Sequence, residues 1–113
     1  MINLIKSSEI ANDTSKGLKY KKISLFIVKK NEEVFLYLNR CPHLGTPLEW
    51  NENEFLDSDK TLIRCATHGA LFQINNGKCL VGPCQGKHLQ SIPFEIKNGE
   101  ITIQEQELFS ITF

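Results

Sequence analysis

The sequence has neither a long apolar run nor an excess of charge of one sign. Its 113 residues include 13 Lys and Arg and 13 Asp and Glu, so the formal net charge is zero. A helix that crosses a bilayer needs about 20 apolar residues, whereas the apolar stretches here, such as 26–28, are strand-sized. Because nucleic-acid and membrane surfaces require concentrated positive charge, we expect neither as a partner.

Targeting signals and helical patterns are also absent from the sequence. The first residues show no basic start followed by an apolar core, and no twin-arginine pair precedes an apolar run, so we expect a cytoplasmic protein. A reducing cytoplasm favours cysteine as a ligand over cysteine as a disulfide partner. No segment shows a sustained helical period, a repeat or low complexity. With 41% apolar residues, the chain is expected to form one all-β domain over 1–113.

Several segments are rich in β-branched and aromatic residues and predict strands. Ile23 to Val28 and Val34 to Leu38 are separated by a polar stretch of hairpin length at 29–33. Asn-Gly pairs, which favour tight hairpins, occur at 76–77 and 98–99. Residues 1–19 predict a short edge strand at Leu4-Ile5, followed by a turn or loop. Further strands are expected at 61–64, 71–74, 78–81, 89–96, 100–104 and 111–113.

Two short motifs predict a metal centre. Cys41-Pro-His43 and Cys65-Ala-Thr-His68 each supply one thiol and one imidazole. Two thiolates and two imidazoles suit either a tetrahedral zinc ion or a [2Fe–2S] cluster. Zinc modules commonly pair Cys with Cys and His with His, whereas here each motif carries one of each. The spacing therefore favours the cluster, with zinc as the alternative.

The segments 41–48 and 65–72 resemble the two ligand loops of the Rieske iron–sulfur family. The resemblance covers roughly residues 20–104 and implies one [2Fe–2S] cluster per chain. It implies that Cys41 and Cys65 hold one iron, and that His43 and His68 hold the other through Nδ1. It also implies an antiparallel β-sandwich base that carries a small cluster-binding subdomain at about 41–84.

Other positions bear on the same resemblance. Gly82-Pro83 matches a third, proline-bearing loop that covers the cluster in the family. The connection between the two ligand motifs is longer than the family's commonest form, and we interpret 51–60 as a polar surface insertion. Thr46 and Thr67 stand where respiratory members form a disulfide between the two loops, so that bridge is excluded.

The resemblance also predicts a low reduction potential. High-potential members carry Ser and Tyr hydroxyls that donate hydrogen bonds to cluster sulfurs, where this chain has Ala70 and Phe72. Without those donors the reduced state is less stable, which predicts a potential near the low end of roughly −150 to +300 mV. These features match the ferredoxin-like branch, which includes components of aromatic-ring dioxygenase systems.

Four further residues with metal-binding or charged side chains have simpler interpretations. We expect Cys79 and Cys84 to be small buried side chains, although their spacing leaves a metal pair or a disulfide open. His88 has no matching Cys and is expected to be a surface or structural residue. Arg64 precedes Cys65 and either offsets the charge of the cluster or is simply solvated.

The functional prediction is a soluble one-electron carrier between a reductase and a terminal oxidoreductase such as an oxygenase. The sequence contains no catalytic triad, phosphate-binding loop or second iron site, so we expect no catalytic activity from the chain alone. Two alternatives remain. One is a regulatory or sensor module whose cluster state alters partner affinity. The other is a small electron-transfer subunit of a larger oxidoreductase such as a nitrite reductase.

Overall fold

The computed structural model describes residues 2–21, 23–40, 55–65, 69–82 and 86–106. Nearly all of its regular structure is β-strand, which confirms the predicted all-β class. The elements in chain order are β1 (Ile2–Lys6), a 3-10 turn η1 (Ser7–Glu9), β2 (Thr14–Tyr20), β3 (Ile23–Lys30), β4 (Glu33–Leu38), β5 (Leu62–Arg64), β6 (Leu71–Gln73), β7 (Cys79–Val81), β8 (Glu95–Lys97) and β9 (Glu100–Ile103).

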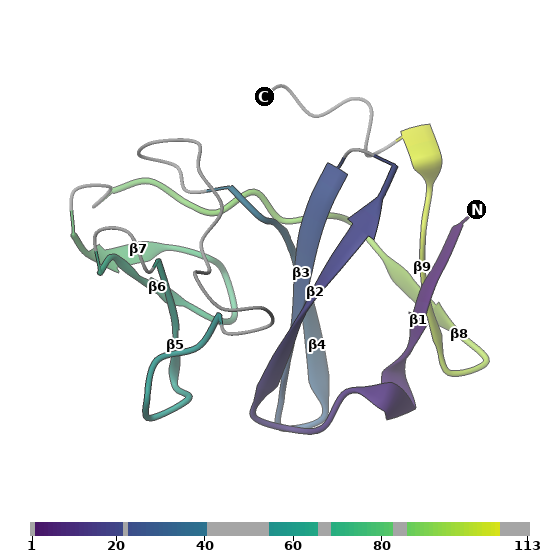
Figure 1. Cartoon of the computed structure of the whole chain (residues 1–113), viewed down its shortest axis with the longest axis horizontal. Helices are drawn as coiled ribbons and strands as arrows, with labels where there is room; N and C mark the ends of the chain where they lie inside the picture. Colours follow the sequence, from purple (N-terminus) through teal and green to yellow (C-terminus); the bar gives the residue numbers. More distant parts are fainter. Residues whose placement is uncertain (1, 22, 41–54, 66–68, 83–85, 107–113) are drawn as a thin grey trace.

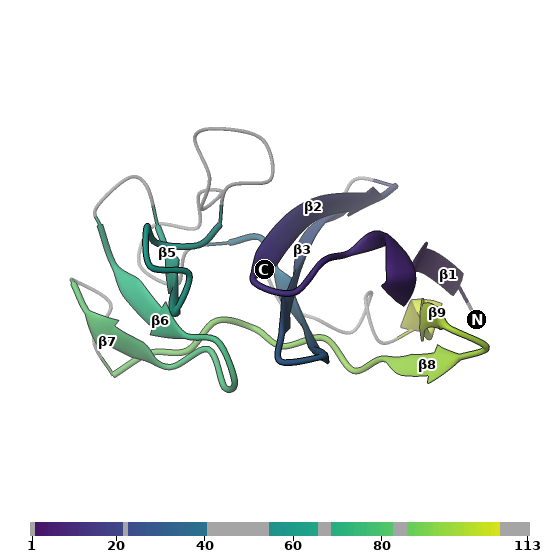
Figure 2. The same cartoon turned by 90° about the horizontal axis from the view of Figure 1, so that it is seen from below.

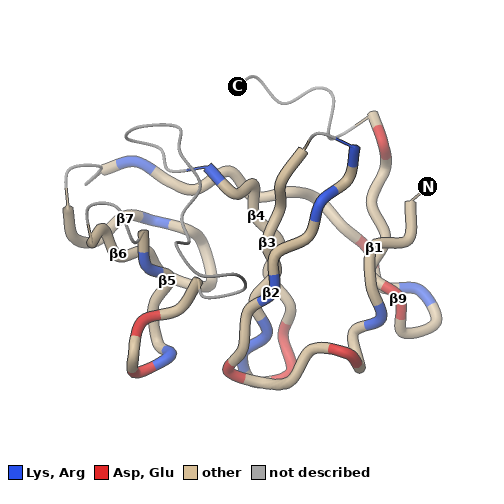
Figure 3. The backbone as a smooth tube through the Cα atoms, in the orientation of Figure 1, with Lys and Arg blue, Asp and Glu red and all other residues tan. Residues whose placement is uncertain are grey.

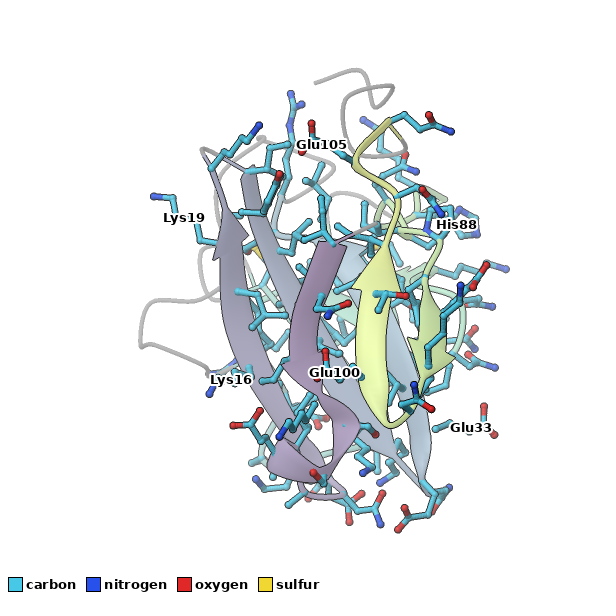
Figure 4. The ribbon with its side chains drawn as sticks, turned by 90° about the vertical axis from the view of Figure 1, so that its right-hand side faces the viewer. Lys16, Lys19, Glu33, His88, Glu100 and Glu105 are labelled. Carbon is cyan, nitrogen blue, oxygen red and sulfur yellow. The ribbon has the colours of Figure 1, made fainter. Side chains whose placement is uncertain are left out.

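These strands form three antiparallel sheets of three strands each, in the orders β1-β9-β8, β2-β3-β4 and β5-β6-β7. Figure 1 shows them side by side, with β5-β6-β7 on the left, β2-β3-β4 in the middle and β1-β9-β8 on the right. The turned view preserves this order (Figure 2). We call β5-β6-β7 the small sheet, and the other two sheets together the base. Within the base, β1-β9-β8 lies in front of the middle sheet when viewed from the right (Figure 4).

The middle sheet is buried on both faces, because it lies between the other two. Side chains of a strand alternate between its faces, and in β3 Leu25 and Ile27 belong to the core shared with β1-β9-β8. Phe26 and Val28 belong to the core shared with the small sheet. This double burial explains why 23–28 is an almost unbroken apolar run rather than an alternating one.

The predicted hairpin between β3 and β4 is confirmed, but its turn is tighter than the expected loop. Lys30 pairs with Glu33, which leaves only Asn31 and Glu32 in the turn, at φ of 51° and 66°. Two consecutive positive φ values characterise the hairpin turn whose twist matches that of the strands. Asn12 stabilises it, since its Oδ1 accepts a 2.7 Å hydrogen bond from the Glu32 N–H.

The prediction of a turn or loop after Leu4-Ile5 was wrong for residues 14–20, which form β2. This strand pairs with β3 along its whole length, from Thr14–Lys29 to Tyr20–Ile23. Polar residues and a glycine obscure its pattern because it is an edge strand, where lysines are common and protect the open edge from further pairing. Tertiary pairing with the apolar β3 therefore determined this structure.

The interpretation of 51–60 as a polar surface insertion was partly wrong. Residues 58–60 are exposed as expected, but Phe55 is fully buried. Its ring stacks on that of Phe26, with centroids 4.4 Å apart and planes inclined by 6°. Its backbone pairs with the end of β5, because the Arg64 N–H donates to the Phe55 carbonyl at 2.9 Å. Phe55 therefore joins the small sheet to the base.

A strand expected at 89–96 is instead a connecting strap with a short strand at its end. Residues 87–89 bond to the small sheet; for example, the Leu89 N–H donates to the Gly77 carbonyl at 2.9 Å. Residues 90–92 bond to β4, where the Leu38 N–H donates to the Gln90 carbonyl at 2.8 Å. Pro93 lacks an N–H, so the ladder stops before β8. The strand expected at 111–113 lies outside the described residues.

Candidate metal centre

The structure describes one of the four predicted ligands, Cys65, at the end of β5. Ile63, two residues earlier, lies opposite Phe72 of β6, which in turn lies opposite Cys79 of β7. Directly opposed residues point to the same side of a sheet, and so do residues two apart on a strand. The Cys65 side chain therefore lies on the inner face of the small sheet, and it is fully buried.

The backbone around Cys65 forms a closed turn. The Cys65 N–H donates to the Ala70 carbonyl, and the Gly69 N–H donates back to the Cys65 carbonyl, both at 2.8 Å. Gly69 has a φ of +68°, which a residue without a Cβ adopts readily. The turn thus fixes the two ends of the segment that contains His68, although residues 66–68 lie outside the described part.

The side chains beside Cys65 are apolar. Ala70 and Phe72, where high-potential members carry hydroxyls, are both fully buried in the core that also contains Cys65. A buried thiolate in such surroundings is costly unless a cation compensates its charge. A site that binds iron meets this requirement, so the donor chemistry of Cys65 fits the predicted cluster.

A second close contact joins the chain near the predicted third loop to this turn. Gly82 has a φ of +109°, and a Cβ placed on it would lie 2.9 Å from both the Cα and the Cβ of Ala70. No other residue fits at such a distance without displacement of the backbone. Gly82 therefore brings the start of the 82–83 segment against the second ligand loop.

The remaining candidates agree with the simpler interpretations where they are described. Cys79 is buried, and its Sγ lies 3.4 Å from the Val81 carbonyl oxygen. His88 is exposed at the molecular surface (Figure 4). Arg64 is exposed as well, which both of its interpretations allow.

Tyr37 is a residue that the sequence analysis did not single out. Its ring lies in the core between the middle sheet and the small sheet, and its hydroxyl donates a 2.5 Å hydrogen bond to the Ile74 carbonyl. Burial raises the pKa of Tyr37 to about 12. Gly77 accommodates the ring, since a Cβ there would lie 3.0 Å from Cε1 of Tyr37. The apolar run at 34–38 predicts that Tyr37 is buried, but it does not identify the carbonyl that accepts its hydrogen bond.

Several predicted positions lie outside the described residues. Among the residues that are described, no group of three or more His, Cys, Asp or Glu side chains could hold a metal. Three of the four predicted ligands are not among them. No helix in the described ranges is long and apolar enough to cross a membrane. The undescribed candidates are Cys41, His43, Thr46, Thr67, His68, Pro83 and Cys84.

Comparison with known proteins agrees with this fold. The model of the Rieske [2Fe-2S] domain family matches residues 1–101. A ferredoxin of Sphingomonas yanoikuyae B1 is 25% identical with a TM-score of 0.73, and the match covers 92% of this chain and 97% of that one. The ferredoxin of carbazole 1,9a-dioxygenase from Nocardioides aromaticivorans IC177 is 15% identical, with a TM-score of 0.70 and coverages of 88% and 92%.

A third structure, a complex of reduced oxygenase and oxidised ferredoxin in carbazole 1,9a-dioxygenase, contains a chain that is 19% identical. Its TM-score is 0.70, and the match covers 88% of each chain. A comparison with curated protein sequences gives no significant match.

The family match and the three-sheet antiparallel fold together identify an iron–sulfur domain of the Rieske type. The chain belongs to the Rieske [2Fe-2S] domain family. The cofactor of this family is a [2Fe–2S] cluster, so the choice between zinc and a cluster is settled in favour of the cluster.

Proposed function

We propose that this protein is a one-electron carrier whose [2Fe–2S] cluster is held by Cys41, His43, Cys65 and His68. When bound, the cluster takes up and gives back a single electron. In this proposal Cys41 and Cys65 hold one iron, and His43 and His68 hold the other. The single domain spans 1–113, with its cluster-binding part at about 41–84.

One observation carries the proposal: Cys65 is fully buried at the end of a strand, in a turn closed by two 2.8 Å hydrogen bonds. A ligand on a rigid strand end keeps its position when the charge of the site changes. The small sheet is held to the base by the Phe26–Phe55 stack and by the Tyr37–Ile74 hydrogen bond. The protein thus supplies a firm platform, which suits outer-sphere electron transfer.

The partners follow from the same proposal. Related ferredoxins belong to carbazole 1,9a-dioxygenase, and one structure is of such a ferredoxin in complex with its oxygenase. By analogy, this chain would accept an electron from a reductase in the cytoplasm and deliver it to a terminal oxidoreductase of the oxygenase kind. With four protein ligands the irons have no open position for a substrate, so the chain itself transfers electrons only.

An optical and EPR spectrum of the anaerobically purified protein, before and after reduction with dithionite, tests the proposal. Imidazole ligation predicts a reddish-brown protein whose reduced form has an average g value well below that of the free electron. A colourless, EPR-silent protein that contains zinc would overturn it. A brown protein with the g values of an all-cysteine cluster would retain the carrier but reject His43 and His68 as ligands.

A further inference from the structure

The outer face of the small sheet carries a row of three side chains at the end next to the proposed ligand loops. Arg64 of β5 lies opposite Leu71 of β6, and Leu71 lies opposite Val81 of β7. Ile63 and Phe72, the neighbours of Arg64 and Leu71 on their strands, are buried on the inner face. Because side chains alternate between the two faces, Arg64 and Leu71 point outward. An irregularity in the β6–β7 register between Leu71 and Phe72 places Val81 on the outward side with Leu71, although Cys79, two residues earlier, is buried on the inner face. We call Arg64, Leu71 and Val81 the outer row.

The outer row contains an apolar side chain, Val81, that is unusually exposed. Val81 is 53% exposed, and among the described residues Ile96, at 50%, is the other exposed large apolar side chain. Leu71 is half-buried beside Val81, and Arg64 is exposed. An apolar surface next to an arginine is typical of protein contacts, where Arg is enriched and the centre of the contact is apolar.

The outer row lies beside the ends of the proposed ligand loops. Arg64 directly precedes Cys65, and Val81 directly precedes Gly82, which packs against Ala70 of the second ligand loop. All three residues are therefore at the end of the small sheet from which the proposed loops depart. A partner that approaches the cluster from this side would contact the outer row.

Charge indicates the kind of partner. Within the described residues, the ion pairs lie in the base: Lys21–Glu105, Lys29–Glu32, Lys30–Asp13 and Lys97–Glu95. Among the described residues of the small sheet and its hairpins, the acidic positions are confined to the turn at 57–59 (Figure 3), whereas Arg64 is the last residue of β5. Asp57 lines a cleft with Arg64, but its Oδ1 accepts the Thr61 and Leu62 N–H groups at 3.0 and 3.2 Å.

We propose that the outer row is part of the surface that binds a redox protein whose own contact surface is apolar with flanking carboxylates. This inference rests on the proposed electron-carrier function and adds a partner chemistry and a contact surface to it. A second copy that used the same row fits less well, because it would bring a second Arg64 and no carboxylate to a contact that already contains Arg64. Rim charges of this kind mainly increase the association rate and make it depend on salt.

The test uses the cluster-loaded protein and a defined acidic donor, flavodoxin in its anionic hydroquinone form. In the reaction the hydroquinone gives up one electron and keeps its proton, and the oxidised cluster gains that electron. Stopped-flow absorbance gives the second-order rate constant at low and high ionic strength. The variants are Arg64→Gln and Val81→Ser, with Lys97→Gln and Ile96→Ser on β8 as controls of matched type and exposure at the far side of the base.

We expect Arg64→Gln to lower the rate constant about threefold or more at low salt and much less at high salt. Val81→Ser should lower it by a similar factor at both salt concentrations, since apolar contact is not screened. The two β8 variants should match the wild type. The optical spectrum shows whether each variant contains the cluster, and the urea midpoint shows whether it is folded. Because all four sites are on the surface, both should match the wild type.

Three results would overturn the inference. One is a rate constant for Arg64→Gln or Val81→Ser equal to that of the wild type. Another is a wild-type rate constant that does not fall as salt increases. The third is a dimer in sedimentation that Val81→Ser dissociates, which would assign the row to a second copy. These results differ from a failure of the proposed electron-carrier function. In that case the wild-type protein would show no cluster absorption and would take up no electron from the hydroquinone.

Discussion

The Tyr37 hydroxyl of the middle sheet donates a 2.5 Å hydrogen bond to the Ile74 carbonyl, just beyond the last strand residue of β6. Both groups are buried, and the bond spans the junction between the base and the small sheet. Replacement of Tyr37 by Phe leaves the carbonyl without this donor. An unsatisfied buried carbonyl costs about 1–3 kcal/mol, so we expect a loss of this order in the free energy of unfolding.

The same variant has a pH signature. The pKa of Tyr37 is raised by burial to about 12, above the value of about 10 that a tyrosine has in an unfolded chain. A raised pKa of an acid means that its contribution to stability is complete below pH 10 and is lost as the pH rises toward 12. Urea unfolding at pH 8 and pH 11 should therefore show a smaller decrease for Tyr37→Phe than for the wild type. An equal decrease would show that Tyr37 ionises as easily in the folded state as in the unfolded one.

A second prediction concerns the contact of Gly82 with Ala70. Gly82→Ala should be destabilising both because φ is +109° and because the new Cβ would lie 2.9 Å from Ala70. We expect a loss of about 2–4 kcal/mol in the free energy of unfolding and faster release of iron to a chelator. Gly86→Ala is the matched control, since Gly86 has a φ of +92° with nothing within 4 Å of the added Cβ. Equal losses for the two variants would remove the steric part of the argument.

A third prediction separates ligands from neighbours. Cys65→Ser and His68→Ala should each abolish the native visible spectrum, because each removes one of the four proposed ligands. Cys79→Ser and His88→Ala are the matched controls and should retain it, since Cys79 lies next to the Val81 carbonyl in the core and His88 is exposed. Iron analysis and visible absorption provide the measurement. Loss of the cluster from folded Cys79→Ser would make the proposed ligand set incomplete.

The sequence predicted the strands that are apolar and the two hairpins that contain Asn-Gly, because these signals are local. At 76–77 only Gly77 has a positive φ, and the turn is wider than the expected tight one, since Gln73 pairs with Lys78. Both Asn98 and Gly99 have positive φ, as the hairpin prediction requires. The edge strand β2 was missed because its lysines and glycine carry no alternation, and only pairing with β3 reveals it. Phe55 was missed because one apolar residue in a polar segment does not show whether it is buried.

At the candidate site, too, the sequence predicts features within one loop but not contacts between loops. The order and spacing of Cys and His predict a metal centre because the proposed ligands of one loop are close in sequence. Contacts between loops have no such signature. The fit of Gly82 against Ala70, and that of Gly77 around the Tyr37 ring, depend on distances between segments far apart in the chain. Each glycine alone indicates only a turn.

A fourth prediction concerns the reduction potential. Phe72 is fully buried in the same core as Cys65 and is directly opposite Cys79. A Tyr at this position would introduce a hydroxyl into apolar surroundings, where it must find an acceptor. If it donates to a cluster sulfur, as the Tyr of high-potential members does, it stabilises the added electron of the reduced state. The potential should then rise.

The size of the shift follows from the strength of such a bond. Hydrogen bonds to charged groups contribute roughly 1.5–3 kcal/mol. A tenfold change in a one-electron equilibrium corresponds to about 59 mV, so we expect an increase of about 65–130 mV. Redox titration followed by optical absorbance measures it. Phe35→Tyr is the control, because Phe35 packs against the same core from β4 without lying on the small sheet. A folded, loaded Phe72→Tyr variant with an unchanged potential would show that the hydroxyl does not bond to a cluster sulfur, and the low potential would then require another cause.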